Sequence, residues 1–119
     1  MRNILLALFM LATSAIAADF TGKWSGEGIT NGESHALYFV LKQTGDTVSG
    51  TSGPDASEQR EFTTIKVDGS KIVLDVTIGE NGSLHFELEG EGDSLKGTVR
   101  VKHGDTSESG TVTMKKIPG

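Results

Sequence analysis

The side chains best spaced for chemistry in this sequence are His85, Glu87 and Glu89, which form a His-x-Glu-x-Glu run. Alternate residues of a β-strand point to the same face, and imidazole and carboxylate groups are ligands that transition metals accept. The next predicted strand, however, brings Lys96 and Arg100 beside this run. We therefore interpret the run as a solvated charged face, and the sequence predicts no metal site.

Catalytic patterns are equally weak. Ser25 lies on a predicted strand with no base near it in the sequence, and no Gly-x-Ser-x-Gly motif is present. The Gly26-Glu27-Gly28 segment lacks the following helix that a phosphate-binding loop needs. Because the carboxylates are scattered, no acid–base pair can be singled out. The sequence predicts a protein that is not an enzyme, with no catalytic residues and no cofactor.

The N-terminal segment has the three parts of a secretory signal peptide: Arg2, an apolar run over residues 4–12, and a small-x-small pattern that ends at Ala17. The apolar run is too short to cross a bilayer, which takes roughly 20 apolar residues. We expect a cleavable signal peptide of residues 1–17 and one mature domain of residues 18–119, exported to the periplasm or the extracellular space.

The amino-acid composition limits the classes of binding partner that we expect for this protein. The 119 residues include no cysteine, so packing and sheet hydrogen bonds are expected to hold the domain without disulfides. The formal net charge is −5, and it becomes −6 when Arg2 is removed with the signal peptide. A nucleic-acid-binding surface needs the opposite balance, so nucleic acid is not an expected partner. We also expect no membrane span after signal cleavage.

Hydrophobic residues alternate with polar ones between glycine-rich turns, which is typical of β-hairpins. Gly-Asp pairs at Gly45 and Gly92 predict type II′ turns, and Asp68-Gly69 predicts a type I′ turn. Residues 53–60 form one long polar connection. The eight expected strands are 20–29, 35–44, 47–53, 61–68, 71–79, 83–91, 94–103 and 109–117.

Each expected strand has one apolar and one polar face, so the sheet must bury its apolar side. An eight-stranded antiparallel up-and-down β-barrel, in which the first strand pairs with the last, achieves this and removes exposed edges. A two-sheet sandwich is the alternative. The turn at Gly92 places Glu89 opposite Lys96 and His85 opposite Arg100 on the polar face.

The sequence also contains an internal echo. Residues 37–41 resemble residues 84–88, and residues 45–51 resemble residues 92–98, both at an offset of 47. Two explanations stay open: duplication of a half-barrel, or two hairpins that met the same turn requirement in the same way.

Residues 20–24 read Phe-Thr-Gly-Lys-Trp, and a Gly-x-Trp on the first of eight meandering strands resembles the calycin superfamily of lipocalins, fatty-acid-binding proteins and avidins. The resemblance implies that Trp24 plugs one end of a lipocalin- or streptavidin-like barrel, beneath a basic residue from a late strand, here Arg100 or Lys115. The chain departs from avidins in having one tryptophan. It departs from fatty-acid-binding proteins because Tyr38 and Arg100 fall on the polar face.

The whole pattern also resembles small exported bacterial barrel domains. It shares with them Gly-Lys-Trp, then Leu-Lys-Gln-x-Gly, then Leu-Lys-Gly-Thr-Val. That likeness implies no activity.

An eight-stranded barrel can be filled by side chains or can hold one small ligand. We expect a non-enzymatic barrel that binds a small hydrophobic ligand; the alternative is a filled barrel that acts through its surface as a protein-binding module or protease inhibitor. The partner is thus a small apolar ligand or a protein. The interior residues predicted to bind the ligand are Trp24, Phe39, Leu41, Leu74, Phe86, Val99 and Met114.

Four apolar side chains fall on the polar face of the predicted strands: Tyr38, Val40, Phe62 and Val73. If the strands bring them together, they form a surface patch for a partner or a second copy, whereas single surface apolar residues are ordinary. We therefore expect a monomer or a weak homodimer.

Overall fold

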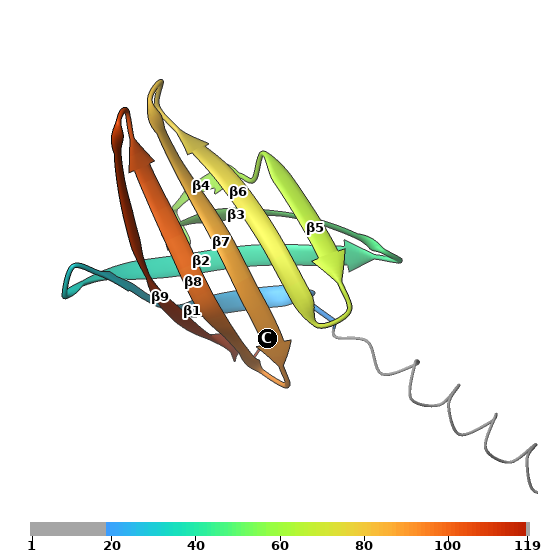
Figure 1. Cartoon of the computed structure of the whole chain (residues 1–119). Coiled ribbons are helices and arrows are strands. Elements are labelled where there is room, and N and C mark those ends of the chain that lie inside the picture. The colour runs from blue at the N-terminus through green and yellow to red at the C-terminus, as the bar shows by residue number, and fades with distance from the viewer. Residues whose placement is uncertain (1–18, 119) are drawn as a thin grey trace, which may run out of the picture.

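The computed structural model describes residues 19–118, and the predicted signal peptide lies outside this range. Within it there is no helix long and apolar enough to cross a membrane. The strands are β1 (Gly22–Thr30), β2 (Glu33–Thr44), β3 (Thr47–Asp55), β4 (Glu58–Glu61), β5 (Thr64–Asp68), β6 (Lys71–Ile78), β7 (Gly82–Glu91), β8 (Ser94–His103) and β9 (Thr106–Ile117) (Figure 1).

All nine strands belong to one antiparallel sheet with the order β4-β3-β2-β1-β9-β8-β7-β6-β5. Pairing of the first strand with the last is confirmed, with Gly26 opposite Met114. The sheet is an up-and-down meander that curls into a half-barrel, and in Figure 1 strands β6 to β8 cross in front of β2 and β3. The predicted all-β, up-and-down class is therefore confirmed.

The predicted count of eight strands is wrong by one, because the polar connection over residues 53–60 contains a short hairpin. β3 continues to Asp55, whose Oδ1 accepts hydrogen bonds from the backbone N–H groups of Ser57 at 2.9 Å and Glu58 at 3.0 Å. These bonds reverse the chain, and β4 then pairs back onto β3 with Arg60 opposite Ser52. Polar edge strands carry little alternation, so the pattern did not reveal β4.

The two edge strands, β4 and β5, are consecutive in the chain, and the chain crosses between the two edges of the sheet at Phe62 and Thr63. The Phe62 N–H donates to the Gly50 carbonyl on β3 at 3.1 Å, and the Thr63 N–H donates to the Asp75 carbonyl on β6 at 2.7 Å. Neighbouring residues thus bind opposite edges of the curled sheet. We call the gap that they bridge the seam.

One predicted turn is shifted by a residue. The turn between β5 and β6 consists of Gly69 and Ser70, with Gly69 first at φ 66°, rather than of Asp68 and Gly69. Asp68 still pairs with Lys71 as the last residue of β5. Glycine in the first central position makes this turn like those at Gly45 and Gly92, since a positive φ there suits a type II′ hairpin.

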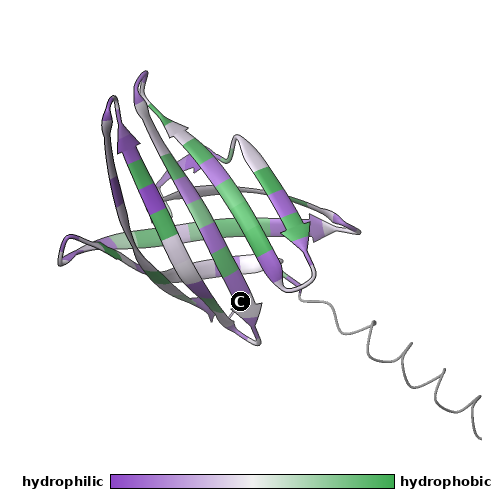
Figure 2. Ribbon diagram, in the orientation of Figure 1, coloured by the Kyte–Doolittle hydropathy of each residue, from purple (hydrophilic) through white to green (hydrophobic). Residues whose placement is uncertain are grey.

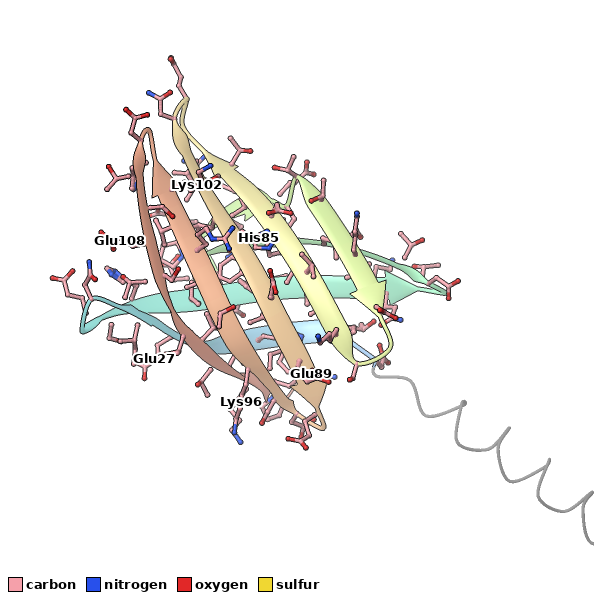
Figure 3. All side chains as sticks on the ribbon, in the orientation of Figure 1. Glu27, His85, Glu89, Lys96, Lys102 and Glu108 are labelled. Atoms are coloured by element: carbon pink, nitrogen blue, oxygen red, sulfur yellow. The ribbon has the colours of Figure 1, made fainter. Side chains whose placement is uncertain are left out.

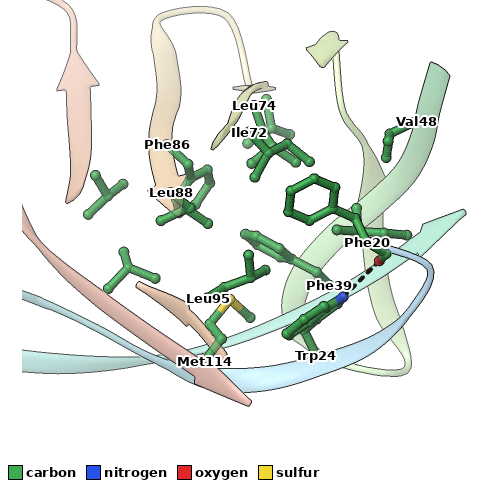
Figure 4. Close-up of a cluster of buried hydrophobic side chains, with 14 residues drawn as sticks. Phe20, Trp24, Phe39, Val48, Ile72, Leu74, Phe86, Leu88, Leu95 and Met114 are labelled. Carbon is green, nitrogen blue, oxygen red and sulfur yellow. Dashed lines mark hydrogen bonds between the residues drawn. The ribbon is translucent and has the colours of Figure 1, made fainter. Parts of the chain in front are cut away.

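Hydropathy alternates along the strands (Figure 2), and the inward apolar side chains form one core at one end of the half-barrel (Figure 4). Phe20 closes that end: its N–H donates to Gln43 Oε1 at 2.9 Å, and its carbonyl accepts from Trp24 Nε1 at 3.0 Å. Trp24 is 1% exposed. The basic group over its ring is Lys116, with Nζ 5.0 Å from the ring centroid, and not Arg100 or Lys115 as the resemblance implied. Successive side chains of a strand point to opposite faces, and Arg100 on β8 and Lys115 on β9 point outward whereas Lys116 points inward.

Candidate ligand-binding cavity

The opposite end of the half-barrel is not filled. A cavity of about 780 Å³ opens to solvent there, between the ends of the strands and the β3–β4 hairpin. Its apolar wall is mainly aliphatic and consists of Leu37, Val76, Ile78, Leu84, Phe86, Val99 and Val101. Volumes of roughly 300–1,000 Å³ with mostly apolar linings are usual for small-molecule sites.

A polar rim surrounds the opening. The ionisable side chains that line it come from β2, β4, β8 and β9, and they are Glu33, His35, Glu58, Arg60, His103 and Glu108. Both the rim and the wall residues lie on the inward side of their strands. They differ in height: the rim residues lie nearer the opening of the cavity than the wall residues do. A ligand with an apolar body and a polar part would therefore meet matching groups in the cavity.

The floor of the cavity is aromatic. Phe86 lines the cavity and makes an edge-to-face contact with Phe39, at 5.1 Å between ring centroids. Phe39 makes a second such contact, at 5.2 Å, with Phe62 from the seam. Edge-to-face pairs of this kind add about 0.5–1.5 kcal/mol to the burial of the rings. This cluster separates the open cavity from the packed core beneath it.

The structure divides the predicted ligand-binding residues between the two ends. Phe86 and Val99 line the cavity, and their role in binding stays a prediction. The other five do not line it; they lie in the packed core, and they are Trp24, Phe39, Leu41, Leu74 and Met114. The alternation assigned these side chains to the correct face, but it contains no information on which end of the barrel Phe20 fills.

Several wall residues were not predicted to bind the ligand, although the alternation of the sequence placed their side chains on the inward face. Leu37, Leu84 and Val101 are only half-buried, which distinguishes them from the core. They lie toward the strand ends next to the polar rim. The signal available in the sequence was closeness to polar residues: Glu33 lies on the same strand as Leu37, and His103 lies on the same strand as Val101.

The His85 run lies on the outer face, where Figure 3 labels His85, Glu89 and Lys96. Its expected register is confirmed, with Glu89 opposite Lys96 and His85 opposite Arg100. His85 lies between two carboxylates: Nδ1 is 2.6 Å from Asp75 Oδ1, and Nε2 is 2.9 Å from Glu87 Oε2.

Both ring nitrogens of His85 are thus occupied by neighbouring protein groups. The hydrogen bonds to Asp75, and secondly to Glu87, raise the pKa of the imidazole above its ordinary value of 6.5. Within residues 19–118, no group of three or more His, Asp or Glu side chains is placed to hold a metal ion.

The predicted surface patch does not assemble. Phe62 points inward and packs against the core, because the chain crosses the seam at this residue; its predicted outward position was wrong. Tyr38 and Val40 lie on β2 and Val73 lies on β6, and four strands separate β2 from β6 in the sheet. The remaining three side chains are half-buried and do not form one surface.

No family model, curated protein or solved structure matches this chain. The meander half-barrel is compatible with the calycin resemblance of residues 20–24, which stays a prediction.

Proposed function

We propose that this protein binds a small aliphatic ligand in the open end of the half-barrel. The observation that carries the proposal is the asymmetry of the interior: one end is packed around Trp24 and Phe39, whereas the other holds a cavity of about 780 Å³ with an aliphatic wall. Apolar area removed from water contributes about 25 cal/mol per Å² to binding. An aliphatic ligand would gain this term along the whole wall.

The proposed role is that of a carrier or sensor outside the cytoplasm, which the expected signal peptide and the resemblance to calycins both support. The alternative function, a filled barrel that acts through its surface, needs a packed interior and an exposed apolar patch. The cavity favours ligand binding over that alternative, and the dispersal of Tyr38, Val40 and Val73 removes the patch that the alternative used.

The test fills the cavity with a side chain. Val101 lies in the wall directly opposite Leu84 on β7, so Val101→Trp would place an indole in the space that the ligand needs. We expect this variant to bind an uncharged naphthylamine fluorescent probe at least about tenfold more weakly than the unmodified protein, a loss of about 1.4 kcal/mol. Fluorescence titration measures this affinity.

The matched control is Lys102→Trp, the same substitution at the next residue, which is exposed on the opposite face of β8. It should leave the affinity for the probe unchanged. Equal affinities of the unmodified protein and both variants, or no binding by any of them, would contradict the proposal.

A further inference from the structure

Two hydroxyl side chains are buried in the lining of the cavity. Ser52 is 4% exposed and Thr30 is 7% exposed. Among residues 19–118 we find no hydrogen-bond partner for either hydroxyl, although every side-chain N or O atom that is sealed from solvent in this range has one. The free hydroxyls therefore open into the cavity, which is the accessible space beside them.

Ser52 is the deeper of the two. It lies on β3 opposite Phe39, which belongs to the aromatic floor, whereas Thr30 is the last residue of β1, next to the turn at the opening. Ser52 also lies opposite Arg60 on β4, so its hydroxyl is a hydrogen-bonding group between the aromatic floor and the nearest charged side chain of the rim.

Ser52 directly follows the first segment of the internal echo, and the residue at the corresponding place after the second segment is apolar. The residue 47 positions after Ser52 is Val99, which also lines the cavity and is 5% exposed. Water can reach the Ser52 hydroxyl while the cavity is empty, but a wholly apolar ligand would displace that water and leave the hydroxyl without a partner, a cost that a valine would not carry. Serine at this position is therefore accounted for if a group inside the cavity bonds to it.

We propose that Ser52 determines the specificity of the cavity, an inference that rests on the proposed function. Ser52 would select aliphatic ligands that carry an uncharged hydrogen-bonding group, a hydroxyl or a carbonyl, at the end that reaches the floor. A hydroxyl side chain can both donate and accept, so it can bond either group. We take the group to be uncharged because the rings of Phe39 and Phe86 offer an ion nothing in place of its water, so an anion would pair with Arg60, opposite Ser52, and not with the hydroxyl.

The experiment compares n-octanol with n-octane, each displacing the naphthylamine probe. Ser52→Ala removes the hydroxyl while keeping the small side chain. We expect the variant to bind n-octanol about 3- to 10-fold more weakly than the unmodified protein, the usual range for one net hydrogen bond, and to bind n-octane equally well. Ser49→Ala, an exposed hydroxyl on the same strand, is the control and should change neither affinity.

The outcomes separate this inference from the proposed function. If n-octane displaces the probe but Ser52→Ala affects both ligands equally, or neither, the role of Ser52 is wrong and the proposed function stands. Tighter binding of n-octanoate than of n-octanol, abolished by Arg60→Gln, would also overturn the inference, because the cavity would then prefer a charged group that pairs with Arg60. If neither ligand displaces the probe from the unmodified protein, the proposed function itself fails.

Discussion

At the scale of single residues, His85 couples the outer face of the sheet to pH. Its ring joins Asp75 on β6 to Glu87 on β7, and Asp75 Oδ2 accepts a further hydrogen bond from the Thr64 hydroxyl on β5 at 2.8 Å. When it is protonated, the ring thus supports a network across three strands that include the edge strand β5. The side chain of His85 is 32% exposed, so solvent screens these interactions and their contribution is expected to stay below about 1 kcal/mol.

The pH dependence of this contribution follows from the direction of the shift. The pKa of His85 is raised in the folded protein, chiefly by Asp75, so the folded state binds the proton more tightly than the unfolded state does. The stabilisation is fully present below the ordinary pKa of 6.5 and is lost as the pH rises through the raised value. His85→Gln should therefore lower the free energy of unfolding at about pH 5.5 and have a smaller effect at about pH 9.

Urea denaturation of both proteins across this range measures the difference between them. The difference is the informative quantity, because His35 and His103 are present in both proteins. A difference that stays constant with pH, or that grows toward alkaline pH, would show that the proton on His85 does not stabilise the fold.

At the scale of the elements, the two hairpins of the echo each contain a glycine at which the paired strands approach closely. Gly50 on β3 and Gly97 on β8 lie 47 positions apart, and a Cβ atom on either would lie about 2 Å from a carbonyl of the neighbouring strand: 2.2 Å from Val40 and 2.0 Å from Glu87. Both glycines allow the paired strands to approach closely on the inward face. The β2–β3 and β7–β8 hairpins therefore agree in local geometry as well as in sequence.

Gly50→Ala and Gly97→Ala should each destabilise the protein by about 1–3 kcal/mol, the usual range for forcing extra volume into packed structure. The contacts are with backbone, which cannot move aside as a side-chain end would. The control is Gly92→Asn in the turn of the β7–β8 hairpin, where a Cβ meets nothing within 4 Å and asparagine tolerates the positive φ of 63°. Urea denaturation should show little change for this control; equal losses in all three variants would contradict the close-approach explanation.

Much of the fold was predictable from the sequence. Alternation identified the strands with an apolar face and their inward residues, and the Gly92 turn fixed the register of β7 and β8. It did not reveal β4, which is polar, nor that Phe62 turns inward, because the crossing at the seam depends on hydrogen bonds to both edges of the sheet.

The candidate site was predicted only in part for a similar reason. The alternation along a strand predicts which face of the sheet a side chain lies on, but not its height in the barrel. Phe86 and Val99 were predicted and line the cavity, whereas Leu41 and Met114 have the same parity and lie in the core. The difference arises because Phe20 folds over one end, which no periodic pattern expresses.

At the scale of the whole molecule, the half-barrel has a packed end, an open end and a seam that connects them. The β3–β4 hairpin lines the cavity, and β4 leads directly into the crossing at Phe62 and Thr63. Phe62 packs edge-to-face on Phe39 at the floor. The residue that closes the seam is thus also part of the boundary between cavity and core, so the shape of the cavity should depend on the seam remaining closed.

Phe62→Ala tests this dependence. Burying a whole phenylalanine contributes about 3–5 kcal/mol in comparable variants, and because Phe62 is half-buried we expect a loss of about 2–3 kcal/mol in the free energy of unfolding. The loss should concentrate at the seam, so that backbone amides of β4 and β5 exchange with solvent faster while those of β1 and β9 keep their protection.

Tyr38→Ala, which removes another half-buried aromatic ring but from the outer face of β2, should not open the seam. Hydrogen exchange followed by mass spectrometry distinguishes the two variants, and affinity for the naphthylamine probe should fall with Phe62→Ala alone. If exchange accelerated evenly over all strands in Phe62→Ala, the ring would support the core as a whole. The cavity would then owe its shape to the sheet and not to the crossing of the chain between its edges.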